Sequence, residues 1–132
     1  MPSIFTKIIR KEIPSYIVAE TENYIAILDA FPLVKGHTLV IPKIEVDKLF
    51  DLDLDLYLGF FGFSKKVSAA IESSVPCNRV SMHVVGLEVP HAHIHLIPIN
   101  STNDCNFANQ KLKFSKEEFE NTAKLISTHF KK

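Results

Sequence analysis

The 132-residue chain has no tryptophan, only four glycines and two cysteines, and no excess of either charge. Fifteen basic residues balance fifteen acidic ones, which excludes the broad positive surface that binds duplex nucleic acid. The two cysteines, Cys77 and Cys105, are too few for a disulfide framework and indicate a reducing compartment. Apolar residues make up 46% of the chain, enough for a buried core that needs no such cross-links.

Long hydrophobic runs are also missing. The longest apolar stretch, 56–63, contains two glycines and is far too short to span a membrane. Charged residues interrupt segment 1–12 before the apolar region of a signal peptide could form. We therefore expect a cytoplasmic protein with neither a membrane nor a nucleic acid among its partners. No repeat, low-complexity tract or linker divides the sequence, which predicts a single domain over residues 1–132.

The spacing of apolar residues changes along the chain. Short segments rich in β-branched and aromatic residues alternate in the manner of strands. Between 54 and 73 the apolar positions recur every three or four residues, which predicts one long amphipathic helix, although Gly59 and Gly62 weaken it. Ser115 and Glu118 have the spacing of a capping box and predict a C-terminal helix that begins there. The expected strands are 15–20, 24–29, 37–41, 79–85 and 89–99.

Strands on either side of a helix, followed by a second helix, are typical of an α+β fold. We expect a mainly antiparallel five-stranded sheet with one long central helix and a C-terminal helix. Pro42 and Pro76 are expected to end the third strand and the long helix, because proline cannot donate to a strand ladder or continue a helix.

The segment 89–98 contains three of the six histidines in the chain. His91, His93 and His95 occupy every second position, and alternate side chains on a strand point to the same face. The sequence therefore predicts a row of three imidazoles, about 6.5–7 Å apart, on one face of a strand. The other face would pack on the core, since it would carry the apolar residues Ala92, Ile94 and Leu96.

Three interpretations of this histidine row are open. Each neutral ring needs a donor and an acceptor partner, so the rings could be purely structural. A His-x-His pair on a strand can also give two ligands to zinc or iron, and all three histidines could serve a metal-dependent enzyme. A further ligand could come from one of three residues at no recognisable spacing: His37, His83 and Glu88. The third interpretation is nucleophilic catalysis at phosphorus.

Imidazole suits attack on phosphorus because its pKa near 6.5 makes it mostly a free base at pH 7 and a capable leaving group once protonated. It can bond to a phosphorus centre, hold it as a phosphoramidate and release it to water. Neighbouring histidines can supply the protons and hydrogen bonds that the phosphate oxygens and the departing group need.

Three blocks of the sequence resemble a known family. His91 to Ile97, His-Ala-His-Ile-His-Leu-Ile, resembles the His-φ-His-φ-His-φ-φ signature (φ is apolar) of the histidine triad superfamily, called HIT. Asp29 to Lys43 resembles that family's Asp-x-x-Pro…Gly-His-x-Leu-Val-Ile-Pro-Lys segment. Ile4 to Pro14 is similar to the start of its nucleotide-binding, nucleoside phosphoramidase branch. The blocks stand in the family's order and cover roughly residues 4–100.

The resemblance implies roles for four histidines. His93 would be the nucleophile that takes the nucleotidyl group at the α-phosphate, and His95 would donate to the phosphate or the departing group. His91 would be a scaffold that holds the His93 ring in the tautomer with a free nitrogen facing the phosphorus. His37 would line the same pocket, and pairing of 37–41 with the triad strand could bring its ring to the same face.

The resemblance also implies a binding site for a purine nucleotide. Asp29 would accept hydrogen bonds from the ribose hydroxyls, a role that suits an acceptor-only carboxylate. The same residue could instead stabilise the turn before Phe31 and Pro32. The apolar slot for the base would be formed by Phe5, Ile8, Ile27 and Ala30.

The loop before the triad departs from the family pattern. Many relatives have a glycine-rich stretch with an asparagine and then a Gly-Gln-Ser-Val run, but here the segment 84–90 is shorter. Glu88 stands in place of a hydroxyl donor. A carboxylate aimed at a phosphate would repel it, so Glu88 should point away or bind the triad histidines. Phosphate anchoring would then rest on backbone amides near Val89.

From the resemblance we expect a hydrolase that binds purine nucleotides and cleaves a phosphoramidate or phosphoanhydride bond at the α-phosphorus. A nucleotidyl-histidine would form on the way, and a nucleoside monophosphate would be released. No cofactor would be required, although a polyphosphate substrate could bring Mg²⁺, and the family implies a homodimer. The alternatives are a dinucleoside polyphosphate hydrolase of the same superfamily, a nucleotide-binding interaction protein with weak or lost catalysis, and the metal-dependent enzyme.

Overall fold

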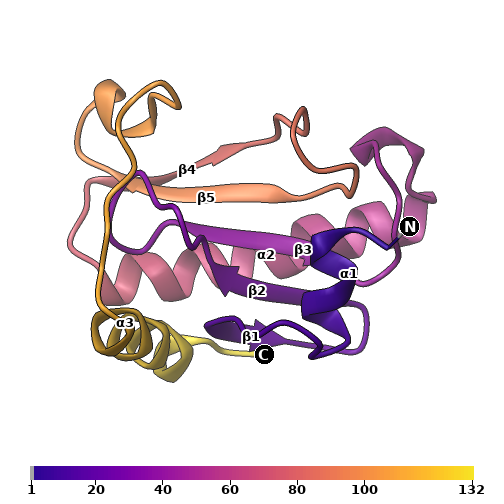
Figure 1. Ribbon diagram of the computed structural model, residues 1–132, viewed down its shortest axis with the longest axis horizontal. Coiled ribbons are helices and arrows are strands. Elements are labelled where there is room, and N and C mark those ends of the chain that lie inside the picture. Colours follow the sequence, from indigo (N-terminus) through magenta and orange to yellow (C-terminus); the bar gives the residue numbers. More distant parts are fainter. Residues whose placement is uncertain (1) are drawn as a thin grey trace.

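A five-stranded antiparallel sheet organises the chain in the computed structural model, which describes residues 2–132 (Figure 1). Its spatial order is β1-β2-β3-β5-β4. The strands are β1 (Ile17–Glu20), β2 (Tyr24–Leu28), β3 (Thr38–Pro42), β4 (Arg79–His83) and β5 (Ile94–Ile99). The helices are α1 (Ile4–Ile9), α2 (Leu54–Ser74) and α3 (Lys116–His129), with short 3-10 turns η1 (Leu49–Asp51) and η2 (Thr102–Cys105). The predicted α+β fold with its antiparallel sheet is confirmed.

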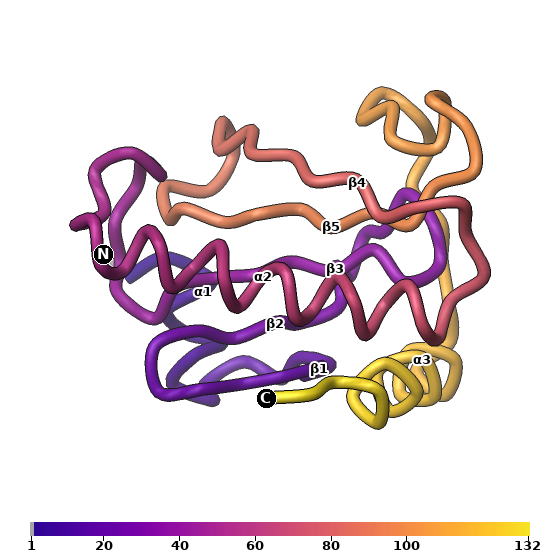
Figure 2. The backbone as a smooth tube through the Cα atoms, turned by 180° about the vertical axis from the view of Figure 1, so that it is seen from behind, coloured from indigo at the N-terminus to yellow at the C-terminus, as the bar shows by residue number. Residues whose placement is uncertain are grey.

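The two faces of the sheet are covered differently, because side chains alternate along each strand. Val40, Ile94 and Leu96 join the larger apolar core, to which α2 contributes Phe60 and Val67. Figure 2 shows α2 lying along this face of the sheet. The opposite face carries α1 and a smaller apolar cluster (Figure 1).

Helix α2 has a side-chain cap at its start and a close contact with Tyr24 at one of its glycines. The Asp53 side chain caps it by accepting from the Leu56 amide at 3.0 Å. A methyl group at Gly59 would overlap the Tyr24 hydroxyl, which donates to the Leu56 carbonyl at 2.8 Å. No atom of residues 2–132 lies within 4 Å of such a group at Gly62. Close packing therefore requires a glycine only at the first position. Within residues 2–132 no helix combines the length and the apolar character needed to cross a membrane.

Two departures from the predicted elements bear on the histidines. Helix α1 is not among the predicted elements, because six residues are too few to show a periodic apolar stripe. The strand predicted from residue 89 begins only at Ile94. Before it, the His91 amide donates to the Val89 carbonyl at 2.8 Å, and the Ala92 amide donates to Val46 at 2.7 Å. These bonds take the segment out of the sheet ladder, so the first two triad histidines precede the strand.

The two glycines of α2 provide a test of this packing. Gly62→Ala is expected to raise the free energy of unfolding by about 0.5–1 kcal/mol, because alanine restricts the unfolded chain and meets no neighbour. Gly59→Ala is expected to lower it by about 1–3 kcal/mol, because the new methyl group displaces the Tyr24 hydroxyl. Urea unfolding followed by circular dichroism measures both changes. A change of the same sign in both variants would contradict the packing described here.

Candidate active site

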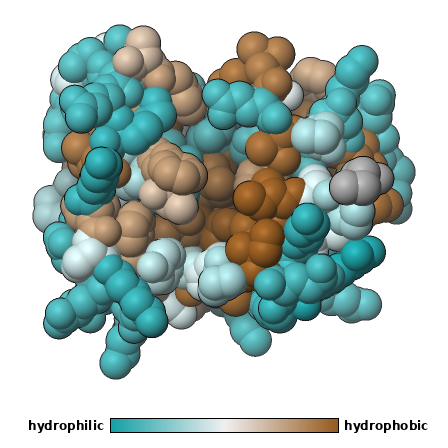
Figure 3. Space-filling model, viewed as in Figure 1, coloured by the Kyte–Doolittle hydropathy of each residue, from teal (hydrophilic) through white to brown (hydrophobic). Residues whose placement is uncertain are grey.

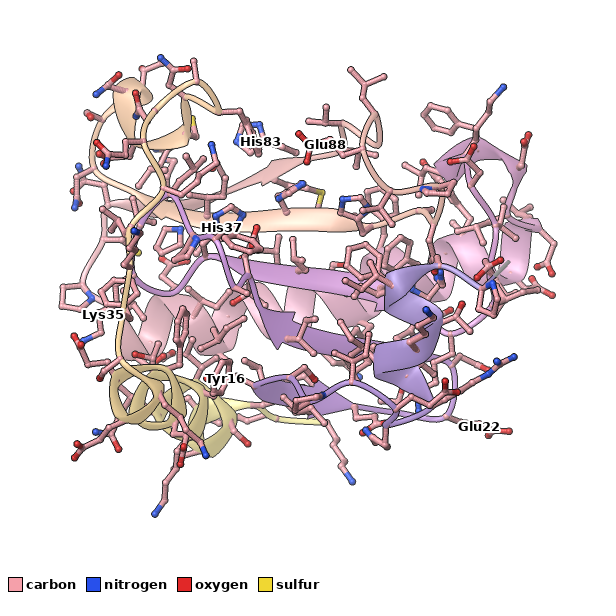
Figure 4. The ribbon with its side chains drawn as sticks, viewed as in Figure 1. Tyr16, Glu22, Lys35, His37, His83 and Glu88 are labelled. Atoms are coloured by element: carbon pink, nitrogen blue, oxygen red, sulfur yellow. The ribbon has the colours of Figure 1, made fainter. Side chains whose placement is uncertain are left out.

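Histidine rings gather on the face of the sheet that carries α1. His93 precedes β5, His95 lies within it, and His37 precedes the neighbouring strand β3. The ring centroids of His93 and His95 are 5.0 Å apart, and those of His37 and His95 are 5.2 Å apart. His83 of β4 is the cross-strand partner of His95, so β5 runs between His83 and His37 (Figure 4). Figure 3 shows that this side of the molecule is hollowed, with apolar residues in the hollow.

Hydrogen bonds fix which ring nitrogen carries the proton in His91 and His93. The Nε2 of His91 lies 2.8 Å from the Pro42 carbonyl oxygen, and the Nδ1 of His93 lies 2.8 Å from the His91 carbonyl oxygen. A carbonyl oxygen only accepts, so both nitrogens must be protonated. In a neutral ring the other nitrogen then keeps its lone pair. His93 is therefore left with an unprotonated Nε2, and His91 with an acceptor at Nδ1.

His37 and His95 form a second series of hydrogen bonds, in which the donors and acceptors are also fixed. The Leu33 amide donates to the Nδ1 of His37 at 3.0 Å, so in the neutral ring the proton sits on Nε2. This N–H lies 3.0 Å from the Nδ1 of His95 and donates to it. His95 must then carry its own proton on Nε2. The adjacent rings of His93 and His95 thus offer an acceptor and a donor side by side.

Burial keeps these rings uncharged near neutral pH. Desolvation lowers the pKa of His37 to about 3, with a smaller effect from the charge of His95. Desolvation also lowers the pKa of His95 to about 4, with a smaller effect from His93. The pKa of His93 is likewise lowered by burial, against the opposing effect of its bond to the His91 carbonyl. All three are therefore neutral at pH 7, which is the condition that the tautomer assignments require.

The unprotonated nitrogen of His93 is accessible. His93 is 7% exposed, whereas His91 is fully buried. Every buried side-chain nitrogen or oxygen in the part of the chain that the structure describes has a hydrogen-bond partner. The Nε2 of His93 has none within residues 2–132, so it is not a buried atom.

Asp29 lies beside the histidines, directly after β2. Its Oδ1 accepts from the Phe31 amide at 2.9 Å, which is the turn-stabilising bond considered from the sequence. Its Oδ2 lies 3.4 Å from the Nε2 of His37. This contact is not an ion pair, because His37 is neutral and its N–H is nearer to His95. Burial raises the pKa of Asp29, and Oδ2 is the oxygen that faces the histidines.

Asp29, His37 and His95 also bring three potential metal ligands within 4.8 Å of one another. The hydrogen-bond directions oppose a cation there, because His37 would have to give up its Nε2 proton while the Leu33 amide occupies its other nitrogen. The triad itself is no better arranged for a metal. Both nitrogens of His91 and the Nδ1 of His93 are engaged in hydrogen bonds. These residues therefore suit a hydrogen-bonded chain better than a metal centre.

An apolar wall adjoins the His93 ring. Phe5 of α1 packs edge-on against it, with ring centroids 4.9 Å apart. Three of the four residues predicted to hold a base are brought together here, whereas Ala30 is exposed and lies outside the cluster. The buried cluster consists of Phe5, Ile8, Ile25, Ile27, Leu39 and Ile41, with Val89 packed against it.

Glu88 lies on the loop between β4 and the triad, on the same side of the molecule as His83 (Figure 4). It is exposed and forms no hydrogen bond to a histidine within residues 2–132, so the predicted bond to the triad histidines is absent. The charge of Glu88 raises the pKa of His93 and that of Asp29. In each residue, burial shifts the pKa by more than Glu88 does. Glu88 is therefore within electrostatic reach of the site without being bound to it.

Comparison with known proteins identifies the family. A HIT domain model matches residues 10–102. The chain belongs to the HIT family. It is 36% identical to an uncharacterized HIT-like protein of Borreliella burgdorferi, over 94% of this chain and 95% of that protein. It is 35% identical to adenosine 5'-monophosphoramidase HNT1 of Saccharomyces cerevisiae, over 72% of this chain and 61% of that protein.

A solved structure supports the same assignment. A Hit-like protein of Bartonella henselae has a TM-score of 0.85 to this chain at 30% identity. The match covers 96% of this chain and 95% of that one. The resemblance drawn from the three sequence blocks is therefore confirmed, and so is the HIT fold.

Phe107 is a residue of this HIT site that the sequence patterns do not reveal. Its ring packs edge-on against three histidines, with centroid distances of 5.0 Å to His95, 5.6 Å to His83 and 6.4 Å to His37. The ammonium group of Lys111 holds the loop by donating to the Phe107 carbonyl at 2.6 Å. The loop follows η2 and has no apolar periodicity, so the one available signal is a lone aromatic residue among asparagines.

The lowered histidine pKa values predict that this HIT protein loses stability in mild acid. Unfolded histidines take up protons around pH 6.5, whereas His37 and His95 stay neutral in the fold down to about 3 and about 4. The unfolded state therefore binds more protons in this range, and the free energy of unfolding falls as the pH drops from about 7 to about 5. His37→Asn, whose amide oxygen can still accept from Leu33, should show a smaller fall. Urea unfolding at about pH 7 and about pH 5 measures the fall in the free energy of unfolding of each protein. Equal falls in the wild type and the variant would show that His37 does not contribute to it.

Proposed function

We propose that this HIT protein hydrolyses nucleoside phosphoramidates through a nucleotide bound covalently to His93. The observation that carries the proposal is the fixed tautomer of His93. Its Nδ1–H bonds to the His91 carbonyl, and its accessible Nε2 keeps a lone pair next to the ring of His95. The yeast relative named as an adenosine 5'-monophosphoramidase supports the choice of substrate class.

In the first step the Nε2 of His93 bonds to the α-phosphorus, and the bond from phosphorus to the leaving nitrogen breaks. The electron pair of that bond goes to the nitrogen, which takes a proton from solvent or the surrounding histidines and departs as an amine. The Nε2–H of His95 donates to a phosphoryl oxygen or to the departing atom. The nucleotidylated His93 ring is positively charged, and the His91 carbonyl stabilises that charge through Nδ1–H.

In the second step a water oxygen bonds to the phosphorus as the bond to His93 breaks. The proton that water loses replaces the one that the amine took, so substrate and water give a nucleoside monophosphate and an amine. His93 returns to its starting tautomer because its Nδ1–H stays in place throughout. These steps need no metal, although a polyphosphate substrate would bring Mg²⁺ with it.

The nucleotide is proposed to lie across the hollow from α1 to the histidines. The purine base would rest against the apolar wall around Phe5, and Ala30 would border that slot from outside the cluster. The ribose hydroxyls would donate to the Oδ2 of Asp29, and the α-phosphate would lie between His93 and the amides near Val89. The homodimer expected from the family stays a prediction. The exposed apolar side chains that offer a surface for it are Met82, Val84, Val85 and Leu87, in and after the edge strand β4.

The charge of Glu88 favours a phosphoramidate over a dinucleoside polyphosphate as substrate. Its carboxylate acts electrostatically on His93, the proposed nucleophile, from an exposed loop. A polyphosphate leaving group is anionic and would be repelled there. A departing amine is not repelled when it is neutral and is attracted once it is protonated.

The first prediction of this proposal concerns the covalent intermediate. Adenosine phosphoramidate turnover by His93→Ala should fall by about a thousandfold or more, as for removal of a nucleophile elsewhere. Rapid-quench mass spectrometry should find an adenylyl adduct on the wild type and none on the variant. His129→Ala, which removes an exposed histidine of α3, is the matched control and should behave as the wild type.

Three results would contradict this mechanism. They are wild-type turnover without an adduct, undiminished turnover by His93→Ala, and loss of turnover in EDTA that zinc restores. The last would instead support the metal-dependent enzyme. Tight nucleotide binding without turnover would support the interaction protein.

The second prediction concerns the leaving group. Glu88→Gln removes the charge and keeps the size of the side chain. The measured quantity is kcat/KM for a dinucleoside polyphosphate divided by kcat/KM for an adenosine phosphoramidate whose leaving group is an amine such as that of lysine. Glu88→Gln should raise this ratio by about fivefold, which is the factor expected for one charge at close range in water. Steady-state assays at low salt with both substrates measure this ratio. If the ratio equals that of the wild type, the charge of Glu88 does not influence the choice of substrate.

A further inference from the structure

A second hydrogen-bonded cluster lies behind the triad, where the start of α1 meets His91. Ser3 caps α1, and its Oγ accepts from the Thr6 amide at 3.0 Å. The same Oγ lies 2.7 Å from the Nδ1 of His91, while the Thr6 hydroxyl lies 3.4 Å from it. One carboxylate oxygen of Glu45, in the segment after β3, accepts from both the Ser3 amide at 2.7 Å and the Thr6 hydroxyl at 2.6 Å.

The directions of these bonds make Ser3 the donor to His91. The Nε2 of His91 is protonated because it faces the Pro42 carbonyl, so in the neutral ring its Nδ1 requires a donor. Thr6 gives its hydroxyl proton to Glu45. The Ser3 hydroxyl is nearer to His91, at 2.7 Å, than to Thr6, at 3.3 Å. Ser3 is 7% exposed and His91 is fully buried, which leaves little access for a water molecule in this role.

Glu45 keeps the two hydroxyls in their separate roles. The bonds from Ser3 and Thr6 lower the pKa of Glu45 to about 2, so the side chain is a carboxylate at neutral pH. A carboxylate only accepts, and it therefore holds the Thr6 proton away from His91. The Ser3 amide bond to the same oxygen fixes the position of the residue that does donate.

We propose that Ser3, held in place by Thr6 and Glu45, is a positioning residue for the nucleophile of this HIT protein. The inference rests on the proposed function, in which His93 attacks phosphorus. Ser3 and the Pro42 carbonyl form hydrogen bonds to the two ring nitrogens of His91. The backbone carbonyl of His91 in turn accepts from the Nδ1–H of His93. A change at Ser3 is thus transmitted through His91 to the position of the carbonyl that holds the Nδ1–H of His93.

The same helical turn also contacts the nucleophile directly. Phe5 lies between Ser3 and Thr6 in the sequence, and its ring packs edge-on against both His91 and His93, at 5.9 Å and 4.9 Å. The start of α1 therefore joins the proposed base slot to the support of the reacting ring. Ser3 itself touches His91 rather than His93, so its loss should act on turnover more than on nucleotide binding.

The test compares Ser3→Ala with Ser3→Thr. Ser3→Ala leaves a buried nitrogen of His91 without its donor and should lower kcat on an adenosine phosphoramidate by about tenfold, as expected when a reacting group is misplaced. The Kd for AMP should change by less than about twofold, and Ser3→Thr, which keeps the hydroxyl, should restore most of kcat. Nitrogen-15 spectra of the histidine rings should show His91 as Nε2–H and His93 as Nδ1–H in the wild type. In Ser3→Ala the His91 Nδ1 resonance should shift because that nitrogen loses its donor, and the His93 Nδ1–H resonance should shift as its carbonyl partner moves.

Ser115→Ala is the matched control, because it also removes a serine N-cap but from α3, where the cap contacts no histidine. Its kcat and histidine spectra should equal those of the wild type. If Ser3→Ala does not fold, Glu45→Ala, which removes the acceptor for Ser3 and Thr6, should alter the histidine spectra in the same way. Unchanged histidine spectra in the folded variant, or equal losses of kcat in Ser3→Ala and Ser115→Ala, would overturn the inference. If the wild type fails to turn over phosphoramidates, the spectra alone decide, so the two proposals fail separately.

Discussion

The hydrogen bond from the Nδ1–H of His93 to the carbonyl of His91 is the interaction on which the rest of the site depends. A backbone carbonyl cannot donate and a backbone amide cannot accept, so these groups impose a direction on every ring that they touch. The Pro42 carbonyl does this for His91, and the Leu33 amide does it for His37. Backbone groups thus set the tautomers of His91, His93 and His37, and His37 in turn sets that of His95. Together they leave an acceptor on His93 and a donor on the adjacent ring of His95.

Strand β5 serves the core and the site at once. Ile94 and Leu96 are fully buried on the side of α2, so the backbone that carries His95 between them is held by the larger core. The register with β3 pairs His95 with Leu39, which belongs to the cluster on the opposite face. A group on such a strand keeps its geometry better than one on a free loop. The triad residues that precede the strand lack this support and are held instead by side-chain and carbonyl bonds.

The sequence predicts those parts of the structure in which apolar residues recur at a regular spacing. The alternation from Ala92 to Leu96 predicts the buried face of β5, and three- and four-residue spacing predicts α2 to within a residue. Pairing of the segment 37–41 with the triad strand, which is considered together with the family resemblance, is present between β3 and β5. The family resemblance, not any period, supplies the expectation that Asp29 and Phe5 lie near the histidines.

The parts that could not be predicted depend on single contacts between distant residues. Helix α1 is one turn and a half long, and it is marked by a cap on Ser3 rather than by a stripe. Phe107 reaches the histidines from a loop whose course depends on Lys111. The start of β5 is displaced because Val46, a residue 46 positions away along the chain, accepts from the Ala92 amide. No local pattern encodes such bonds, because the partner is defined only once the sheet has formed.

Neutrality explains why one face can hold so many histidines and why one of them can react. Charged imidazoles at centroid distances near 5 Å would repel, and their burial would carry a large desolvation cost. Neutral rings avoid both costs if each buried nitrogen has a partner of the right kind, and within residues 2–132 each does. Within residues 2–132 the Nε2 of His93 is unprotonated, has no hydrogen-bond partner and is not a buried atom. The arrangement that makes the cluster stable therefore also leaves the Nε2 lone pair of His93 available for attack.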